Sequence, residues 1–484
     1  MIKLKEQGWL VVIGCTLLST LFFYLSTGLG SIWALAWVAP LPLLWLAYSK
    51  QPWWRIGLAT FLAFGIGNSE FIRPFYGMGG ATIGVTFGVL GLAATAVAAI
   101  LLSRWVHKRS NWAGALLFFP ALWTAAEYVT SLVSPNGTIG SFAYTQVGAP
   151  VLIQSAALFG IWSITFLICL VANGLALSLR DRERAKPLIL VVTILFLSNL
   201  SFGIFRLNTS AGQSTARIAV IAKDFSVLRK SPGQTWTATT AEYAAEIHKV
   251  VAAHQGLAAV VLPEKLAILQ PSWRATALTP LAKEARADHV RIIAGFDDEV
   301  PGATGHNIAI TFEPDGTSQT YVKRHLVTAE SSSDEGSLTP GSTAGLLGDG
   351  TAVEICKDMD FPDMIRSDVT GHGVGIVYAP AEDFTIDHWM HARVAVMRGV
   401  ENGFSVVRSA RKGEQTISNN RGQVLIRGMS STAAFSSSVA TVPVGNGNTL
   451  YGKVSDIFAW TSILLTVAIL GFSIRPYQKT RTRK

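Results

Sequence analysis

Charged residues are scarce in this sequence of 484 residues: they make up 15% of it, whereas half of the residues are hydrophobic. A chain this apolar is not an ordinary soluble protein. The shortage is uneven, because residues 1–205 and 456–474 are almost continuously apolar and the residues between them have an ordinary soluble composition. We therefore expect a membrane-embedded part and one extramembrane domain with a full core.

Eight apolar stretches are candidates for membrane spans, since about 20 apolar residues cross the hydrocarbon layer. The first lacks a clear small-residue cleavage site and further spans follow it directly, so we expect no cleaved signal peptide. An even number of spans places both termini on the same side. The expected spans are residues 8–26, 32–49, 54–72, 82–105, 112–133, 150–178, 187–205 and 456–474.

Positive charge separates the two sides of the membrane. Sixteen Lys and Arg residues lie in the termini and in alternate short loops, whereas the opposite short loops hold Arg73 only. The positive-inside rule makes the basic side cytoplasmic, so the domain after the seventh span faces outward. That domain is nearly neutral, with 23 Lys and Arg against 25 Asp and Glu over residues 206–454. The cations flank spans instead of forming one face, which gives nucleic-acid binding no support.

Cysteine is also rare, with three residues in the chain. Cys15 and Cys169 lie inside expected spans, where a small apolar side chain is unremarkable. Cys356 stands alone in the outward-facing domain, which excludes a disulfide within that domain. Because structural cysteines in an oxidising compartment normally pair, Cys356 is a candidate functional thiol.

The outward-facing domain alternates predicted strands with predicted helices. Pro314-Asp315-Gly316 indicates a hairpin turn, and the Ser-rich stretch 429–438 is typical of a flexible surface loop. We predict domains over residues 1–206 (seven spans), 207–452 (catalytic domain) and 453–484 (eighth span and basic tail). The predicted strands are 216–224, 257–263, 289–296, 307–312, 318–323, 352–356, 374–379, 404–409, 414–418 and 423–426, with helices over 235–255, 272–287, near 361 and over 387–402.

Three reactive side chains stand at predicted strand ends, where loops can open a cleft: Glu264, Lys323 and Cys356. A thiol attacks as its thiolate, so Cys356 needs a base or a nearby cation. Glu264 can accept the proton, and Lys323 can stabilise the thiolate and an oxyanion. Spacing alone leaves the alternative open that Glu264 and Lys323 are solvated surface charges.

The residues around these positions resemble the motifs of the nitrilase, or carbon–nitrogen hydrolase, superfamily. The resemblance implies an αββα sandwich with a Glu-Lys-Cys triad, in which Glu264 is the general base, Lys323 the oxyanion stabiliser and Cys356 the nucleophile. It also implies Glu330 as an accessory carboxylate, and we expect Asp358 to be a supporting acid. The matching segments are Pro263-Glu264, Tyr321–Leu326 followed by Glu330, Cys356–Pro362 and Arg398–Asn402.

A nitrilase-like domain between a seventh and an eighth span resembles the apolipoprotein N-acyltransferase family, as do the stretches Trp123–Glu127 and Ser141–Gln146. The resemblance implies acyl transfer from a phospholipid to Cys356 as a thioester, and then to the α-amino group of a diacylglyceryl-cysteine lipoprotein. It implies a multi-pass protein of the bacterial inner membrane with its catalytic domain on the periplasmic side. We expect a monomer that needs no cofactor or metal.

The sequence departs from that family's pattern in several places. Lys357 follows Cys356 where an aromatic residue is usual, and Asp358 stands where Glu is frequent. Thr328-Ala329 replaces Pro-Phe-Gly, and Ala381–Phe384 lacks the usual Asn-Asp-x-Trp. A membrane-tethered amidase, or an acyltransferase with another amine or water as acceptor, therefore stays open. A non-catalytic scaffold that binds lipoproteins is disfavoured by the intact triad.

Several other polar residues have ordinary interpretations. Glu70 and Glu127 lie at outer span ends, and acids at membrane depth are candidates for function. His388 and His391 are three residues apart on a predicted helix, but no third ligand has suitable spacing, so we expect no metal there. Lys357 is a candidate for assisting the thiolate, but we expect it to be solvated. Asp358 and Asp360 are candidates for a cation site, but we expect Asp360 to be a surface residue.

Overall fold

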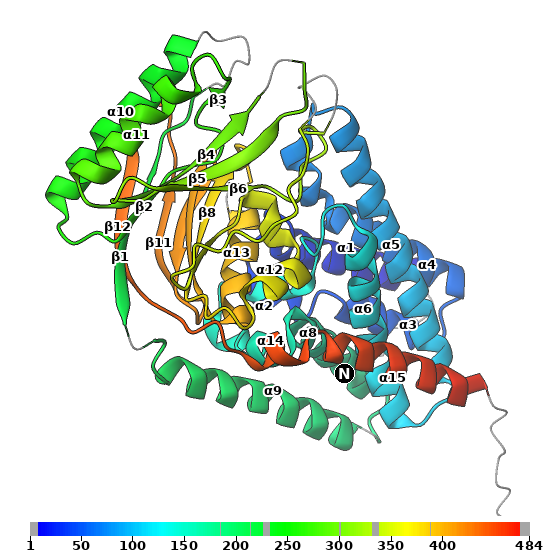
Figure 1. The fold of residues 1–484 in the computed structure, drawn as a ribbon. Helices are drawn as coiled ribbons and strands as arrows, with labels where there is room; N and C mark the ends of the chain where they lie inside the picture. Colours follow the sequence, from blue (N-terminus) through cyan, green and yellow to red (C-terminus); the bar gives the residue numbers. More distant parts are fainter. Residues whose placement is uncertain are drawn as a thin grey trace, which may run out of the picture. The chain divides into compact units, whose positions relative to one another are not determined.

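The computed structural model describes residues 8–183, 185–212, 214–225, 233–299, 302–331, 338–387 and 389–474. The chain forms two compact units, one made of Met1–Phe205 with Asp456–Lys484 and the other of Arg206–Ser455 (Figure 1). The first unit is helical, and the second contains both β-sheets.

In the part of the first unit that the structure describes, six helices are long and apolar enough to cross a membrane. Polar backbone groups in a bilayer core must bond within the segment, which an α-helix achieves. The chain is therefore a multi-pass membrane protein. The six helices are α1 (Trp9–Ser26), α5 (Gly80–His107), α6 (Trp112–Val133), α8 (Ile161–Arg180), α9 (Ala185–Asn208) and α15 (Ile457–Ile474).

Two further predicted spans take a shorter form. Residues 32–49 contain α2 (Trp33–Ala36) and α3 (Leu41–Ala47), and residues 54–72 contain α4 (Trp53–Gly67). The predicted span 150–178 is also too long at its start, because Gly160 at φ 67° separates the short α7 (Ala156–Phe159) from α8.

In this unit, a buried side-chain amide replaces a backbone hydrogen bond that is missing from one helix. Pro120 lies inside α6 and has no backbone N–H, which leaves the carbonyl of Leu116 without its helical donor. Asn173 of α8 donates its Nδ2 to Leu116 O at 2.8 Å and to Ala115 O at 2.9 Å. The contact joins α6 to α8 and satisfies the freed backbone group.

The second unit is built on two β-sheets. The first has the strand order β12-β1-β2-β4-β5-β6, with β3 paired to β4, and the second has the order β11-β10-β9-β8-β7. The first sheet contains β1 (Thr215–Ala222), β2 (Ala259–Val261), β3 (Ile268–Leu269), β4 (Arg291–Asp298), β5 (His306–Phe312), β6 (Ser318–Val322) and β12 (Ser436–Pro443). The second contains β7 (Thr351–Val353), β8 (Ile376–Glu382), β9 (Ser405–Arg411), β10 (Glu414–Ser418) and β11 (Val424–Met429).

Side-chain alternation along the strands produces four layers, because successive residues of a strand point to opposite faces. In β1, Ile218 and Val220 pack between the sheets, whereas Ala219 and Ile221 pack under the outer helices α10 (Gly233–Ala253) and α11 (Arg274–Ala287). Helices α12 (Pro362–Val369) and α13 (Trp389–Asn402) cover the second sheet in the same way. The unit is an αββα sandwich (Figure 1).

Most predicted elements are present, including the hairpin of β5 and β6 around Pro314–Gly316. The loop prediction for 429–438 is wrong in its last part, because β12 begins at Ser436 and pairs antiparallel with β1 along its whole length. Ser has a weak strand propensity, and the partner strand outweighs it. The strand expected over 352–356 is also too long: β7 ends at Val353, and Cys356 begins a 3-10 helix, η6 (Cys356–Asp360).

Candidate active site

Glu264 lies shortly after the central strand β2, which ends at Val261, and is 1% exposed. Its Oε1 accepts from Lys323 Nζ at 2.8 Å, and its Oε2 accepts from the backbone N–H of Glu382 at 3.0 Å. Gly295 permits this position, since a Cβ at that residue would come within 2.5 Å of Glu264 Cα. The carboxylate is thus held by the sheet itself and by fixed donors.

Lys323 follows β6 and is also fully buried. Its Nζ contacts Glu264 at 2.8 Å and both oxygens of Glu330 at 3.0 and 3.1 Å. Burial disfavours the ammonium, but the two carboxylates outweigh that effect and raise the pKa of Lys323 well above its usual value. The site therefore holds a permanent positive charge in a water-poor place.

Glu330 is the second carboxylate that contacts this ammonium, and it also contacts Asn307 and Lys265. Its Oε1 accepts from Asn307 Nδ2 at 2.7 Å, and the same amide donates to Glu264 Oε1 at 2.6 Å. Lys265 approaches Glu330 to 2.8 Å. Although burial favours the neutral acid, Lys323 and Lys265 lower the pKa of Glu330 below its usual range. Glu330 stays ionised and keeps Lys323 charged.

Cys356 sits at the start of η6 with φ 43°, a left-handed conformation that is unusual for a residue other than glycine. The residue is partly buried, and its Sγ donates to the carbonyl of Glu382 at 3.6 Å. Removal from water raises the pKa of the thiol well above its usual value, and the charge of Glu264 adds to the rise, while Lys323 opposes it. The resting group is a thiol, so attack requires a base.

Asp358 is completely buried and fixes the backbone around the thiol. Its Oδ1 accepts from the backbone N–H of Arg324 at 3.2 Å and of His325 at 2.8 Å. Its Oδ2 accepts from Ile355 N at 3.2 Å and from the Tyr321 hydroxyl at 2.8 Å. One carboxylate thereby ties the turn that carries Cys356 to the segment that carries Lys323.

Two expectations about neighbours of the thiol are wrong. Lys357 is 6% exposed and not solvated: its Nζ donates to Leu326 O at 3.2 Å, and burial lowers its pKa. Asp360 is 3% exposed and not a surface residue, and burial raises its pKa to about 6 against the charge of His391. The fold packs α13 over η6, which the local sequence does not reveal.

Two groups of described residues bring three potential metal-ligand atoms within 4.8 Å of one another. One contains Asp383, Asp387 and His391, but Asp383 is already ion-paired with Arg408, and His391 with Asp387. His388, the other histidine of the predicted pair, lies outside the described residues. The permanent charge of Arg408 occupies the place that a cation would take beside Asp383.

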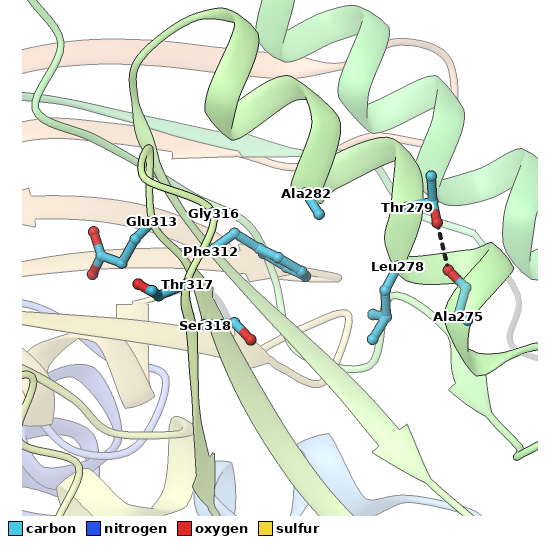
Figure 2. Close-up of a pocket in the computed structure, with 9 residues that line it drawn as sticks. All are labelled: Ala275, Leu278, Thr279, Ala282, Phe312, Glu313, Gly316, Thr317 and Ser318. Atoms are coloured by element: carbon cyan, nitrogen blue, oxygen red, sulfur yellow. Dashed lines mark hydrogen bonds between the residues drawn. The ribbon is translucent and has the colours of Figure 1, made fainter.

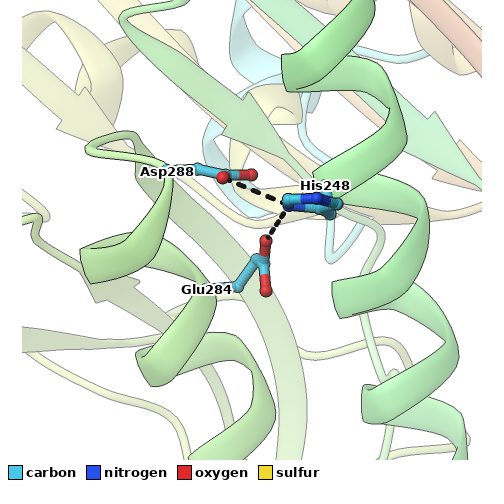
Figure 3. Close-up of side chains that lie close together, drawn as sticks. All are labelled: His248, Glu284 and Asp288. Atoms are coloured by element: carbon cyan, nitrogen blue, oxygen red, sulfur yellow. Dashed lines mark hydrogen bonds and ion pairs between the residues drawn. The ribbon is translucent and has the colours of Figure 1, made fainter.

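The second group lies on the outer helices α10 and α11 and in the turn after α11 (Figure 3). His248 of α10 places its Nδ1 3.0 Å from Glu284 and 3.2 Å from Asp288, at the end of α11. These carboxylates raise the pKa of His248, with Asp288 the larger influence. A protonated His248 therefore joins α10 to α11 as an ion pair.

A pocket of about 240 Å³ lies between α11 and the turn of the β5–β6 hairpin (Figure 2). Leu278, Ala282 and Phe312 supply its apolar wall, and Glu313 lies at its edge. None of the residues predicted for the active site lines it. We assign it no part in the chemistry.

In the helical unit, Glu127 joins the two stretches that resemble the family. Trp123 Nε1 donates to its Oε1 at 3.0 Å, and the Phe142 N–H does so at 3.1 Å. The hydroxyls of Ser141 and Thr165 donate to its Oε2 at 2.6 and 2.9 Å. This carboxylate ties α6 to η3 (Phe142–Gln146) and to α8.

Glu70, the other acid predicted near a span end, lies in the short turn η1 (Ser69–Phe71) and is 8% exposed. Its Oε2 is 3.6 Å from Arg73 Nη1. Gly28 has φ 56°, and a Cβ there would come within 2.9 Å of Glu70 Cβ. Glu70 packs against the turn after α1, as a structural contact.

Two family models match the chain. The model of the apolipoprotein N-acyltransferase N-terminal domain matches residues 17–174, and the carbon–nitrogen hydrolase model matches residues 230–454. Curated proteins named apolipoprotein N-acyltransferase are similar over most of their length. That of Geobacter metallireducens is 26% identical and covers 95% of this chain and 94% of its own, and that of Haemophilus influenzae is 24% identical and covers 81% and 82%.

Solved structures are also similar to part of the chain. Nit3 of Saccharomyces cerevisiae, a member of the nitrilase superfamily, has a TM-score of 0.41 at 18% identity and covers 57% of this chain and 99% of its own. An amidase from Nesterenkonia sp. has a TM-score of 0.39 at 18% identity and covers 51% and 95%.

The helical membrane unit and the αββα domain define a multi-pass membrane enzyme of the carbon–nitrogen hydrolase superfamily. Within that superfamily the chain belongs to the apolipoprotein N-acyltransferase family, and it is an acyltransferase. The family resemblance of the sequence motifs is thereby confirmed.

Sequence reasoning missed several members of the site. Asn307, Lys265 and Glu382 contact the predicted residues directly. Asn307 gave a usable signal, because a polar amide stands in the otherwise apolar strand pattern NIAITF. Lys265 and Glu382 gave none, since charged residues at strand ends are ordinarily solvated.

Proposed function

We propose that this enzyme transfers an acyl chain from a phospholipid, through a thioester on Cys356, to the α-amino group of the N-terminal diacylglyceryl-cysteine of lipoproteins. The observation that carries the proposal is the buried cluster of Glu264, Lys323 and Glu330, whose charges act on the Cys356 thiol. Such a cluster supplies a base and a fixed positive charge to one nucleophile. Family membership supports the choice of substrates.

In the first half-reaction, Glu264 accepts the thiol proton while Sγ of Cys356 attacks the ester carbonyl carbon of the phospholipid. The oxyanion that forms is stabilised by the charge of Lys323, which burial keeps free of competing water. The carbon–oxygen ester bond then breaks. Glu264 returns its proton to the departing oxygen, and a lysophospholipid leaves behind an acyl thioester.

In the second half-reaction, the neutral α-amine of the lipoprotein attacks the thioester carbon. Glu264 accepts a proton from the nitrogen, and the carbon–sulfur bond breaks. Sγ recovers the proton and the acyl chain remains on nitrogen as an amide. Glu330 and Asp358 take no part in bond formation; Glu330 keeps Lys323 ionised, and Asp358 holds the backbone of the two loops together.

We propose that eight spans hold this chemistry at the membrane, with residues 207–452 as the catalytic domain on the periplasmic side of the bacterial inner membrane. Two contacts support crossings by the shorter helices of the second and third spans, residues 32–49 and 54–72. Arg104, near the basic end of α5, donates to Gln51 O at 2.6 Å, and Arg180, at the end of α8, donates to Trp45 O at 3.0 Å. The turn between α3 and α4 therefore lies at the basic ends of α5 and α8.

The proposal is tested by following one acyl chain through both halves. Purified enzyme is incubated with phospholipid alone, and the mass of the Cys356 peptide is measured before and after treatment with hydroxylamine, which cleaves thioesters. Loaded enzyme then receives a diacylated lipopeptide with a free amino terminus, the same lipopeptide with a blocked amine, or buffer.

We expect loading by one acyl chain, release by hydroxylamine, and discharge by the free-amine lipopeptide only. Discharge in buffer at the same rate would identify a hydrolase, and this membrane-tethered amidase-like activity would replace the proposal. A failure of phospholipid to load Cys356 would refute the thioester route altogether.

A further inference from the structure

A cationic rim adjoins the reacting thiol, built around Glu382. The backbone of Glu382 contacts the catalytic groups on both sides, because its carbonyl accepts from Cys356 Sγ at 3.6 Å and its N–H donates to Glu264 at 3.0 Å. In its carboxylate, Oε1 lies 2.8 Å from Lys412 Nζ, and Oε2 lies 2.7 Å from Arg411 Nη2. These two cations are thereby fixed close to the reacting atoms.

The two cations differ in their access to solvent. The side chain of Arg411 is 1% exposed and holds Glu382 from inside, where its guanidinium also lies 4.8 Å from the centre of the Phe225 ring. The side chain of Lys412 is 39% exposed. Lys412 is therefore the cation of this rim that an incoming ligand can reach.

The backbone at Lys412 has an unfavourable conformation that fixes the position of this residue. It lies in the turn between β9 and β10 with φ 53°, a conformation that a residue with a side chain adopts rarely. Its N–H donates to Asp224 Oδ1 at 2.6 Å, which fixes the turn. The ammonium is thus presented from a constrained position and not from a mobile loop.

Two cations share one carboxylate at this rim, because Arg411 and Lys412 both pair with Glu382. Around the thiol itself, charges of both signs occur: besides burial, Glu264 and Asp383 raise the pKa of Cys356, whereas Lys323 and Arg408 lower it. Arg411 can keep Glu382 paired when Lys412 contacts another negative group. Lys412 can therefore bind an anionic group of a ligand without leaving Glu382 unpaired.

We propose that Lys412, which pairs with Glu382 at rest, binds the phosphate of the phospholipid donor while the donor's ester lies at Cys356. This inference rests on the proposed function and names the substrate group that the rim recognises. A lysine ammonium is a compact charge with rotatable donors and suits a phosphodiester. The acceptor has no phosphate, and its amino group in the protonated form would be repelled, so Lys412 favours the donor half-reaction.

The test compares two acyl donors on the same preparation of full-length enzyme in detergent micelles. One donor is a diacyl glycerophospholipid, and the other is a p-nitrophenyl ester of the same fatty acid, which has no phosphate. The measured quantity is the ratio of their initial rates of loading onto Cys356, because loss of folded enzyme cancels in the ratio. Lys412→Met keeps the length of the side chain, and Lys412→Arg keeps its charge.

We expect Lys412→Met to lower the ratio about tenfold, through a higher KM for the phospholipid, and Lys412→Arg to restore most of it. Lys249→Met, in an exposed ion pair with Glu246 on α10, is the matched control and should keep the wild-type ratio. Millimolar inorganic phosphate should slow loading by phospholipid in the wild type more than in Lys412→Met.

An unchanged ratio in Lys412→Met would overturn the inference, and so would equal sensitivity of both proteins to inorganic phosphate. If neither donor loads the wild-type enzyme, the proposed function itself fails. If the ester loads normally and the ratio does not respond to Lys412, only the phosphate subsite fails.

Discussion

Lys323 Nζ lies 2.8 Å from Glu264 Oε1, so the expected base and the expected oxyanion stabiliser form a buried ion pair before any substrate binds. A buried pair of this kind loses much when one partner is removed, because the other charge stays in a water-poor place. Glu330, 3.0 Å from the same ammonium, limits that loss for Lys323. The arrangement allows Glu264 to be neutralised by a proton without leaving Lys323 unpaired.

Glu264→Gln should therefore leave the enzyme folded and nearly inactive. The amide cannot accept the thiol proton, and losing a general base costs at least about two orders of magnitude in rate. The measurement is the rate of acyl loading onto Cys356 by mass spectrometry. Glu242→Gln, which changes an exposed carboxylate on α10, is the control, and a loading rate for Glu264→Gln within tenfold of that control would contradict the assignment.

Cys356→Ala should abolish both thioester formation and turnover. Cys356→Ser should bind lipid and turn over very poorly, because an alkoxide forms far less readily than a thiolate. The matched controls are Cys15→Ala and Cys169→Ala in the helical unit, which should keep activity because neither thiol lies in the catalytic unit. An essential Cys15 or Cys169 with a dispensable Cys356 would show that the nucleophile is elsewhere.

Asn307 provides a test of positioning. Its amide donates to Glu264 at 2.6 Å and to Glu330 at 2.7 Å, so Asn307→Leu should lower the loading rate by about 10- to 100-fold with little loss of folded protein. Asn307→Asp should be worse at pH 8 and recover in part at pH 6, since a third carboxylate repels the other two until it is protonated.

The control for Asn307 is Asn448→Asp, an exposed residue close to the C-terminal end of the second unit, which should keep the wild-type pH profile. A purely structural role for Asn307 would lower activity equally at every pH. Equal pH profiles for Asn307→Asp and the wild type would therefore contradict the positioning role.

The sequence predicts most strands of this domain well because near-continuous runs of Val, Ile and Ala mark strands that are buried on both faces. The sequence does not predict contacts between residues that lie far apart in the chain. Glu264 and Glu382 are 118 residues apart, and Asn307 and Glu264 are 43 apart, so no local pattern announces their contacts. For the same reason, the local sequence predicts Asp360 at the surface, although the fold buries it.

The residue types also predict the wrong local secondary structure at two points. Three serines at the start of β12 read as a loop, although pairing with β1 makes them a strand. Cys356 follows a strand-like pattern, yet φ 43° turns the chain into a 3-10 helix there. That turn presents the thiol beside Glu382, and its unusual backbone conformation has no signature in the residue types around it.

Membrane topology is testable at one informative position. Reporter fusions at Ser110 and Arg182 should behave as cytoplasmic and one at Asn448 as exported, whether six or eight segments cross. A fusion at Gln51 separates the two cases, because eight spans place it in the cytoplasm and six place it outside. The contact between Arg104 and Gln51 predicts the cytoplasmic result.

An exported reporter at Gln51 would reduce the spans to six, the number of long apolar helices among the described residues. A cytoplasmic reporter at Asn448 would be more serious. It would place the catalytic domain on the wrong side for the proposed substrates.

The pH dependence of stability should report the buried carboxyl of Asp297. It is 4% exposed, and burial raises its pKa from 3.8 to about 7, with the charges of Glu330 and Glu264 adding to the rise and Lys265 opposing it. The folded protein thus holds this proton more tightly than the unfolded chain. The free energy of unfolding must fall as pH rises from about 4 to about 7 and stay level with respect to this group above that.

Asp297→Asn removes the titration, so the difference in Tm between variant and wild type should grow in the variant's favour from pH 5 to pH 8. The shift corresponds to at most about 4 kcal/mol, and a change of several degrees is expected for a domain of this size. The measurement is thermal unfolding of the full-length protein in detergent at constant ionic strength. Asp363→Asn, exposed in the first turn of α12, is the control and should show a constant difference across this range. If Asp297→Asn also gave a constant difference, Asp297 would be ionised throughout this pH range, and burial would not raise its pKa as stated.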